Sequence, residues 1–180
     1  KVAFMGGVFI LIGHITMALS GFNFNLFYFG LGCIATGTGL LKPNVSVMVG
    51  KLYSDAHEDQ RVQGFNIYYM GINIGAVIAP IAVGFVAEKV SWHAGFGLAA
   101  IGMAIGLWIF KRGEKDFPAN CKISNQALIN SRFAGIKLHY LVYAMLLALA
   151  VIFATLLANP IQSTVVSGVC LVILGGYIIS

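Results

Sequence analysis

The stretch that decides the fold is LFYFGLGCIATGTGLLKPNVSVMVG, which runs from Leu26 to Gly50. It is apolar apart from a few small polar side chains and carries a single charged residue, Lys42. Roughly 20 consecutive apolar residues in a helix are enough to cross the hydrocarbon core of a bilayer. The stretch therefore predicts a membrane-spanning helix with one cation inside the membrane.

The rest of the chain repeats this pattern. Hydrophobic residues make up 59% of the 180 residues and charged residues only 9%, which is typical of a membrane protein. The apolar runs are Val2–Ser20, Leu26–Gly50, Val62–Ala87, His93–Phe110, Leu138–Ala158 and Ile161–Ile179. We expect an all-α fold of polytopic transmembrane helices. Because the chain opens on a lysine and stops directly behind an apolar run, we expect an internal piece of a longer protein.

The basic residues indicate which side of the membrane each connection lies on. If every run crosses once, Lys89 falls on one side and nearly all other Lys and Arg residues fall on the opposite side. The positive-inside rule makes the basic side cytoplasmic, including Lys1 and the segment 111–137. The net charge of +5 then reflects topology and contact with membrane lipid rather than nucleic-acid binding, because no basic patch is interleaved with aromatic residues in a polar segment.

The polar segment 111–137 predicts a cytoplasmic linker between two membrane parts, residues 1–110 and residues 138–180. The second part is a pair of apolar runs joined by Asn159-Pro160, a turn signal. It carries few polar side chains, so we expect a lipid-facing hairpin there and the functional residues in the first part.

The sequence contains no motif that is typical of an enzyme active site or of a metal site. The three cysteines, Cys33, Cys121 and Cys170, are far apart, and no histidine or second thiol lies at a metal-ligand spacing from those within spans. His14 is a lone histidine in a span, which more often forms an interhelical hydrogen bond than carries a proton. We therefore expect neither an enzyme nor a cofactor or metal site.

Lys42 is the residue with the clearest functional signal. It lies nine residues before Lys51, roughly 13 Å along a helix, which makes snorkelling to the interface difficult. A lysine at this depth costs at least about 2.5 kcal/mol on insertion scales. All six acidic residues fall outside the apolar runs, so we expect a water-filled cavity, a substrate or another part of the protein to compensate the charge. The alternative is a snorkelled or packing lysine. Pro43 follows directly and predicts a kink.

The next apolar run places Phe65, Tyr69 and Asn73 four residues apart, with Ala76 continuing the same helical stripe. An amide side chain both donates and accepts hydrogen bonds, which suits a peptide amino group or backbone amide. From spacing alone, an interhelical hydrogen bond by Asn73 is an equal alternative.

Two stretches of the chain are distinctive: GTGLLKPNVSVMVGKLY, Gly37 to Tyr53, and FNIYYMGINIGAVIAP, Phe65 to Pro80. They resemble the proton-dependent oligopeptide transporter family of the major facilitator superfamily, in its bacterial di-/tripeptide permease branch. The resemblance implies that residues 1–110 are helices 3 to 6 of the N-terminal bundle in a major-facilitator fold. It also implies that residues 138–180 are the inserted transmembrane hairpin, and that helices 1, 2 and 7 to 12 are the missing partners.

The resemblance further implies proton-coupled symport of di- and tripeptides by alternating access in the bacterial inner membrane, with protons as coupling ion and no other cofactor. Lys42, within KPN, matches the family residue for the peptide carboxylate and proton coupling. Tyr69 and Asn73, within YYMGIN, match substrate-binding positions, and Phe65 is a candidate gate residue. The first-helix motif E-x-x-E-R of the family lies outside this chain.

Two other functions remain compatible with these residues. A transporter of another small anion, such as nitrate or an amino acid derivative, could use the same lysine. In a non-transporting membrane assembly or receptor subunit, Lys42 would pair with an acidic residue of a partner.

Overall fold

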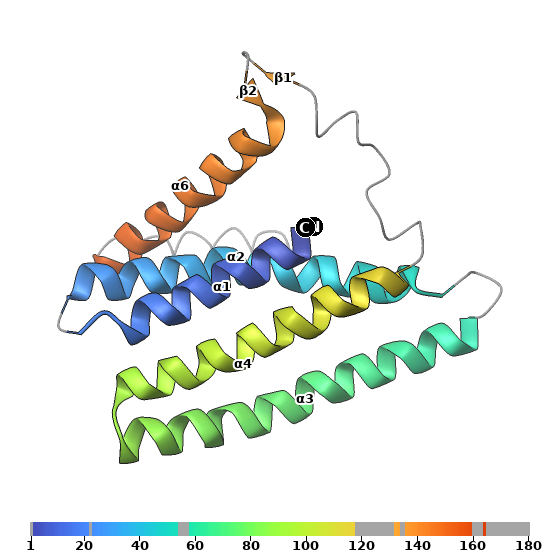
Figure 1. Ribbon diagram of the computed structural model, residues 1–180, viewed down its shortest axis with the longest axis horizontal. Coiled ribbons are helices and arrows are strands. Elements are labelled where there is room, and N and C mark those ends of the chain that lie inside the picture. The colour runs from blue at the N-terminus through green and yellow to red at the C-terminus, as the bar shows by residue number, and fades with distance from the viewer. Residues whose placement is uncertain are drawn as a thin grey trace.

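The computed structural model describes residues 2–21, 23–53, 58–117, 132–133, 136–159 and 164, with the side chains of 132–139 outside the description. The α-helices of this part are α1 Val2–Ala18, α2 Phe24–Lys51, α3 Glu58–Lys89, α4 Trp92–Gly113 and α6 Leu138–Ala158 (Figure 1). A short 3₁₀ helix, η2, covers Glu114–Asp116. Strands β1 Arg132–Phe133 and β2 Ile136–Lys137 pair antiparallel within the expected linker.

The helices coincide with the first five apolar runs, which confirms the all-α prediction. Four of them, α2, α3, α4 and α6, are long and apolar enough to cross a membrane, and α1 is apolar but shorter, at 17 residues. The observed helices α2 and α3 extend beyond the predicted runs at the Lys51 and Glu58 ends. Lys51 lies in a last helical turn, and Glu58 and Asp59 lie in a first turn, where their charges favour the helix dipole. The sixth run, Ile161–Ile179, lies outside the described residues except for Thr164.

The pair α1 and α2 packs through glycines. A Cβ atom placed on Gly37 would lie 2.5 Å from the carbonyl oxygen of Gly6, and one on Gly30 would lie 2.9 Å from that of Gly13. Both distances are too short for a real side chain, so the two backbones are in direct contact at both levels. This is the packing for which small residues are used in membrane helices.

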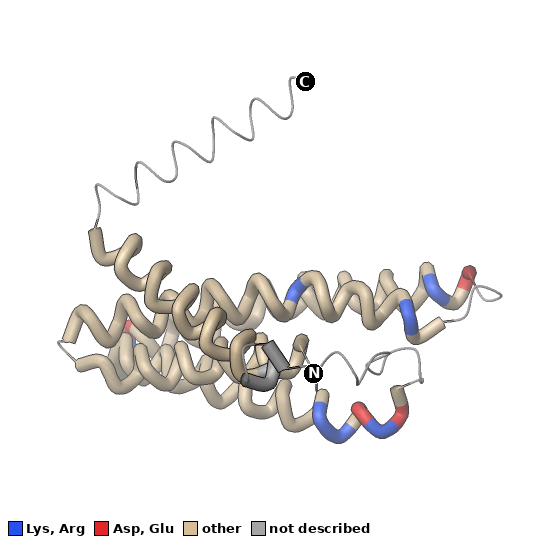
Figure 2. The backbone as a smooth tube through the Cα atoms, turned by 90° about the horizontal axis from the view of Figure 1, so that it is seen from above, with Lys and Arg blue, Asp and Glu red and all other residues tan. Residues whose placement is uncertain are grey.

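Helix α4 lies alongside α1, and α3 lies on the far side of α4 (Figure 1). Ser91 precedes α4 and caps it, because the Ser91 hydroxyl accepts a 3.1 Å hydrogen bond from the Ala94 backbone N–H. His93 Nδ1 lies 3.3 Å from the carbonyl oxygen of Met17, which joins the start of α4 to the end of α1. Most of the charged positions lie near helix ends (Figure 2).

Helix α6 crosses α2 and packs against it (Figure 1). Its residues Leu146, Ala150 and Ala154 are buried, and a Cβ atom on Gly32 of α2 would overlap the Ala150 carbonyl and lie 3.0 Å from the Ala154 nitrogen. The other large side chains of α6 are mostly exposed. Helix α6 therefore packs on α2 through one stripe, because the missing side chain at Gly32 lets the α6 backbone reach α2, while most of its other large side chains face outward.

Candidate functional site

Lys42 lies on α2, and both Lys42 and Pro43 are exposed. The helix continues past Pro43 to Lys51, so the proline does not end it. The polar neighbours bond to their own helix. The Asn44 side chain donates to the Leu40 carbonyl at 2.8 Å, and the Ser46 hydroxyl donates to the Lys42 carbonyl at 3.3 Å. Lys42 is thus the group on this part of α2 that is available to a charged ligand.

The ion pairs between described residues lie at helix ends. Arg61 pairs with Glu58 at 2.8 Å, and Lys111 pairs with Glu114 at 2.5 Å. Lys42 belongs to neither pair. Because an ammonium within a membrane span needs water or a counter-charge, Lys42 is suited to attract an anion from outside these helices.

Phe65, Tyr69 and Asn73 all lie on α3, which runs unbroken from Glu58 to Lys89. The Phe65 and Tyr69 rings are stacked, with centroids 6.4 Å apart and planes 29° apart, and the Tyr68 ring lies 5.6 Å from the Tyr69 ring. This confirms that Phe65 and Tyr69 share one stripe. Tyr69 and Asn73 are exposed, so α3 presents an uncovered face that combines aromatic rings and an amide.

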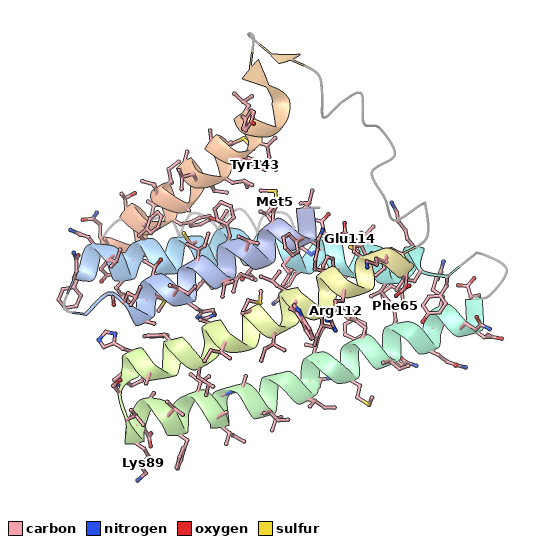
Figure 3. The ribbon with its side chains drawn as sticks, viewed as in Figure 1. Met5, Phe65, Lys89, Arg112, Glu114 and Tyr143 are labelled. Carbon is pink, nitrogen blue, oxygen red and sulfur yellow. The ribbon has the colours of Figure 1, made fainter. Side chains whose placement is uncertain are left out.

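Helices α2 and α3 meet at the Lys51 end of α2. Phe65 of α3 lies against Gly50 of α2, since a Cβ atom on Gly50 would be 3.6 Å from the tip of the Phe65 ring. The Tyr53 ring lies directly over Gly64, where an added Cβ would overlap it. Figure 3 shows Phe65 at this end of the molecule. The sequence reasoning missed the Tyr53–Gly64 contact, although Tyr53 ends the first recognised stretch and Gly64 directly precedes the second.

These contacts relate the depth of Lys42 to that of Asn73. The two helices run in opposite directions, with Lys42 eight residues before Gly50 and Asn73 eight residues after Phe65. Both residues therefore lie roughly 12 Å along their helices from the Gly50–Phe65 contact. The structure brings Phe65 and Tyr69 into contact, and Lys42 and Asn73 lie at equal distances along their own helices from the Gly50–Phe65 contact.

A cavity of 310 Å³ lies at the opposite end of the helices. It is lined mainly by aromatic residues, Phe24, Phe27, Trp92 and Phe96, together with His93 and small or polar residues of the α1–α2 connection. None of its lining residues is a lysine, arginine or carboxylate. Its aromatic lining suits the membrane interface rather than a charged ligand.

Comparison with known proteins shows to which family the chain belongs. Residues 1–146 match the model of the POT family. The chain is 50% identical over 112 residues to an uncharacterized transporter of Bacillus subtilis, covering 62% of this chain and 22% of that protein. It is 45% identical over 119 residues to a di-/tripeptide transporter of Lactococcus lactis, covering 66% of this chain and 24% of the relative.

Among solved structures, the chain resembles a peptide transporter POT crystallised as a mutant in complex with alafosfalin. The TM-score is 0.65 at 38% identity, covering 90% of this chain and 32% of that structure. The chain thus spans about a quarter to a third of the length of these relatives, as a fragment of a major-facilitator fold does. Because the family match covers residues 1–146 of the 180, the chain belongs to the POT family.

Proposed function

We propose that this chain is part of a proton-coupled symporter that takes up di- and tripeptides by alternating access. The observation that carries the proposal is that Lys42 and Asn73 are both exposed and each lies eight residues along its helix from the Gly50–Phe65 contact. Relatives from Lactococcus lactis and Lactobacillus helveticus are di-/tripeptide transporters, and one from Yersinia enterocolitica is a peptide transporter. A peptide has a carboxylate and amide groups, which a lysine and an asparagine recognise by charge and by hydrogen bonds.

In this proposal Lys42 holds the peptide carboxylate. Charge attraction is several-fold stronger in a poorly hydrated cavity than in water, so one ammonium can orient the peptide. Asn73 bonds the peptide backbone or amino group, and the Tyr69 ring lies one turn away on the same helix as a further contact. The remaining helices, 1, 2 and 7 to 12, supply the opposite wall of the cavity.

Proton coupling follows from competition for the same ammonium. Lys42 pairs in alternation with the peptide carboxylate and with a carboxylate of the missing helices. Protonation of that second carboxylate releases Lys42 for the peptide, which links proton entry to substrate binding. No further cofactor is needed in this scheme.

We also propose how the chain lies in its membrane. Basic residues gather at Lys51, Arg61 and the end of α4, which favours a cytoplasmic location for that side. Lys1 and the linker 111–137 then lie in the cytoplasm of a bacterial cell, and the protein is a multi-pass protein of its inner membrane. Residues 1–110 act as helices 3 to 6, and residues 138–180 act as the inserted hairpin.

The test uses the full-length transporter in liposomes with an inward proton gradient. We expect Lys42→Ala to abolish dipeptide accumulation, whereas Lys89→Ala, a change at an exposed helix end, keeps it. Accumulation by Lys42→Ala at the wild-type rate would refute the coupling role. Uptake of labelled nitrate or of a labelled amino acid that dipeptides do not inhibit would identify a transporter of another small anion. Liposomes that neither bind nor move peptide would favour a non-transporting assembly.

A further inference from the structure

Two reciprocal contacts join α2 to α3, and in each an aromatic ring lies on a glycine. Tyr53, just after α2, covers Gly64 of α3, and Phe65 of α3 covers Gly50 of α2. Gly64 is buried, and the two rings and Gly50 are half-buried. We call these four residues the aromatic clasp.

The two halves of the clasp differ in tightness. A Cβ atom on Gly64 would overlap the Tyr53 ring and lie 2.5 Å from the Tyr53 hydroxyl oxygen, so even alanine would displace the ring. A Cβ atom on Gly50 would lie 3.6 and 3.8 Å from Phe65 ring atoms, which is ordinary contact. The Tyr53–Gly64 half is therefore the closer of the two contacts.

Away from the clasp, α3 packs against α4 rather than α2 (Figure 1). The direct contacts between α2 and α3 thus lie at one end, and the remaining support for their relative height is indirect, through α4 and α1. A slip of one helical turn there would move one helix by about 5.4 Å relative to the other. Such a slip would separate Lys42 from the level of Asn73.

We propose that the aromatic clasp sets the depth register between Lys42 and Asn73, so that both reach one bound peptide. Tyr53, Gly64, Phe65 and Gly50 are then positioning residues, and Phe65 acts through α2 rather than only as a gate. This inference rests on the proposed peptide site, because the register matters only if one ligand spans both helices.

The first test measures dipeptide uptake by the full-length transporter in which every cysteine, including Cys33, Cys121 and Cys170, is replaced by alanine. Replacing Gly50 and Phe65 by cysteine removes the ring contact, so the half-saturation concentration for dipeptide should rise about tenfold. Bridging the two thiols with a short bifunctional reagent should return it to within about threefold of the parent value. A wild-type half-saturation concentration before bridging, or no recovery of it after bridging, would refute the role of the clasp. The two single-cysteine variants, treated with the same reagent, are the controls.

The second test does not depend on transport. Spin labels at Val47→Cys and Ile67→Cys, two exposed positions about one turn from the clasp, report the α2–α3 distance in the same protein. We expect a narrow distance distribution that Gly64→Ala and Tyr53→Ala both broaden and that Gly84→Ala, with open space around it, leaves unchanged. Unchanged distributions in both clasp variants would refute the proposal. Wild-type liposomes that move no dipeptide, together with a broadened distribution, would refute the peptide function but retain the clasp.

Discussion

The α1–α2 interface and the middle of α3 use glycine in opposite ways. Gly6, Gly13, Gly30 and Gly37 bring two backbones into contact, whereas Cβ atoms on Gly71 and Gly75 of α3 would meet nothing within 4 Å. Residues 69–81 of α3 are all exposed, although most of them are apolar. The α1–α2 interface is therefore closely packed between two described helices. The middle of α3 is an exposed face that we expect the remaining helices and the ligand to cover.

The largest effect is expected from a substitution that disrupts the α1–α2 interface. Gly37→Val places a branched side chain against the Gly6 carbonyl and should lower the free energy of unfolding by about 3 kcal/mol, the upper end for overpacking. Gly39→Val, two residues away on the same helix, has open space and is the control. Thermal unfolding of both detergent-purified full-length variants measures the difference. Equal midpoints would show that α1 and α2 do not pack as described.

A smaller effect is expected where α6 reaches α2. Gly32→Leu overlaps the Ala150 carbonyl and should separate the helices, lowering the free energy of unfolding by about 2 kcal/mol. Because a long linker connects α6 to α4, we expect the first four helices to stay folded. Spin labels on α2 and α6 of the full-length transporter should report a longer distance in the variant than in wild type. Identical distances in both proteins would contradict the contact.

The smallest effect is expected on the uncovered face. Asn73→Ala should raise the half-saturation concentration for dipeptide about fivefold, close to 1 kcal/mol and to one hydrogen bond. Membrane insertion and thermal stability should stay at wild-type values, because no described helix covers Asn73. Uptake kinetics of the full-length variant measure the change. An unchanged half-saturation concentration with reduced stability would assign Asn73 to helix packing instead.

The helices could be predicted from the sequence because a segment in lipid must satisfy its own backbone hydrogen bonds. A long apolar run therefore has few alternatives to forming a helix. The four-residue spacing of Phe65 and Tyr69 likewise predicted that they share one stripe, on which their rings are stacked. The contact of Ala150 with Gly32 and that of Tyr53 with Gly64 could not be predicted, because a missing side chain does not indicate which partner will approach it. The depth match of Lys42 and Asn73 also depends on such a contact, at Gly50 and Phe65.

The most direct test concerns the partner of Lys42. In the full-length transporter, binding of a dipeptide and of its C-terminal amide would be compared for wild type and Lys42→Ala. If Lys42 holds the carboxylate, wild type should prefer the free acid by about tenfold or more, which corresponds to about 1.4 kcal/mol, and Lys42→Ala should lose that preference. An equal preference for the free acid in both proteins would contradict the assignment.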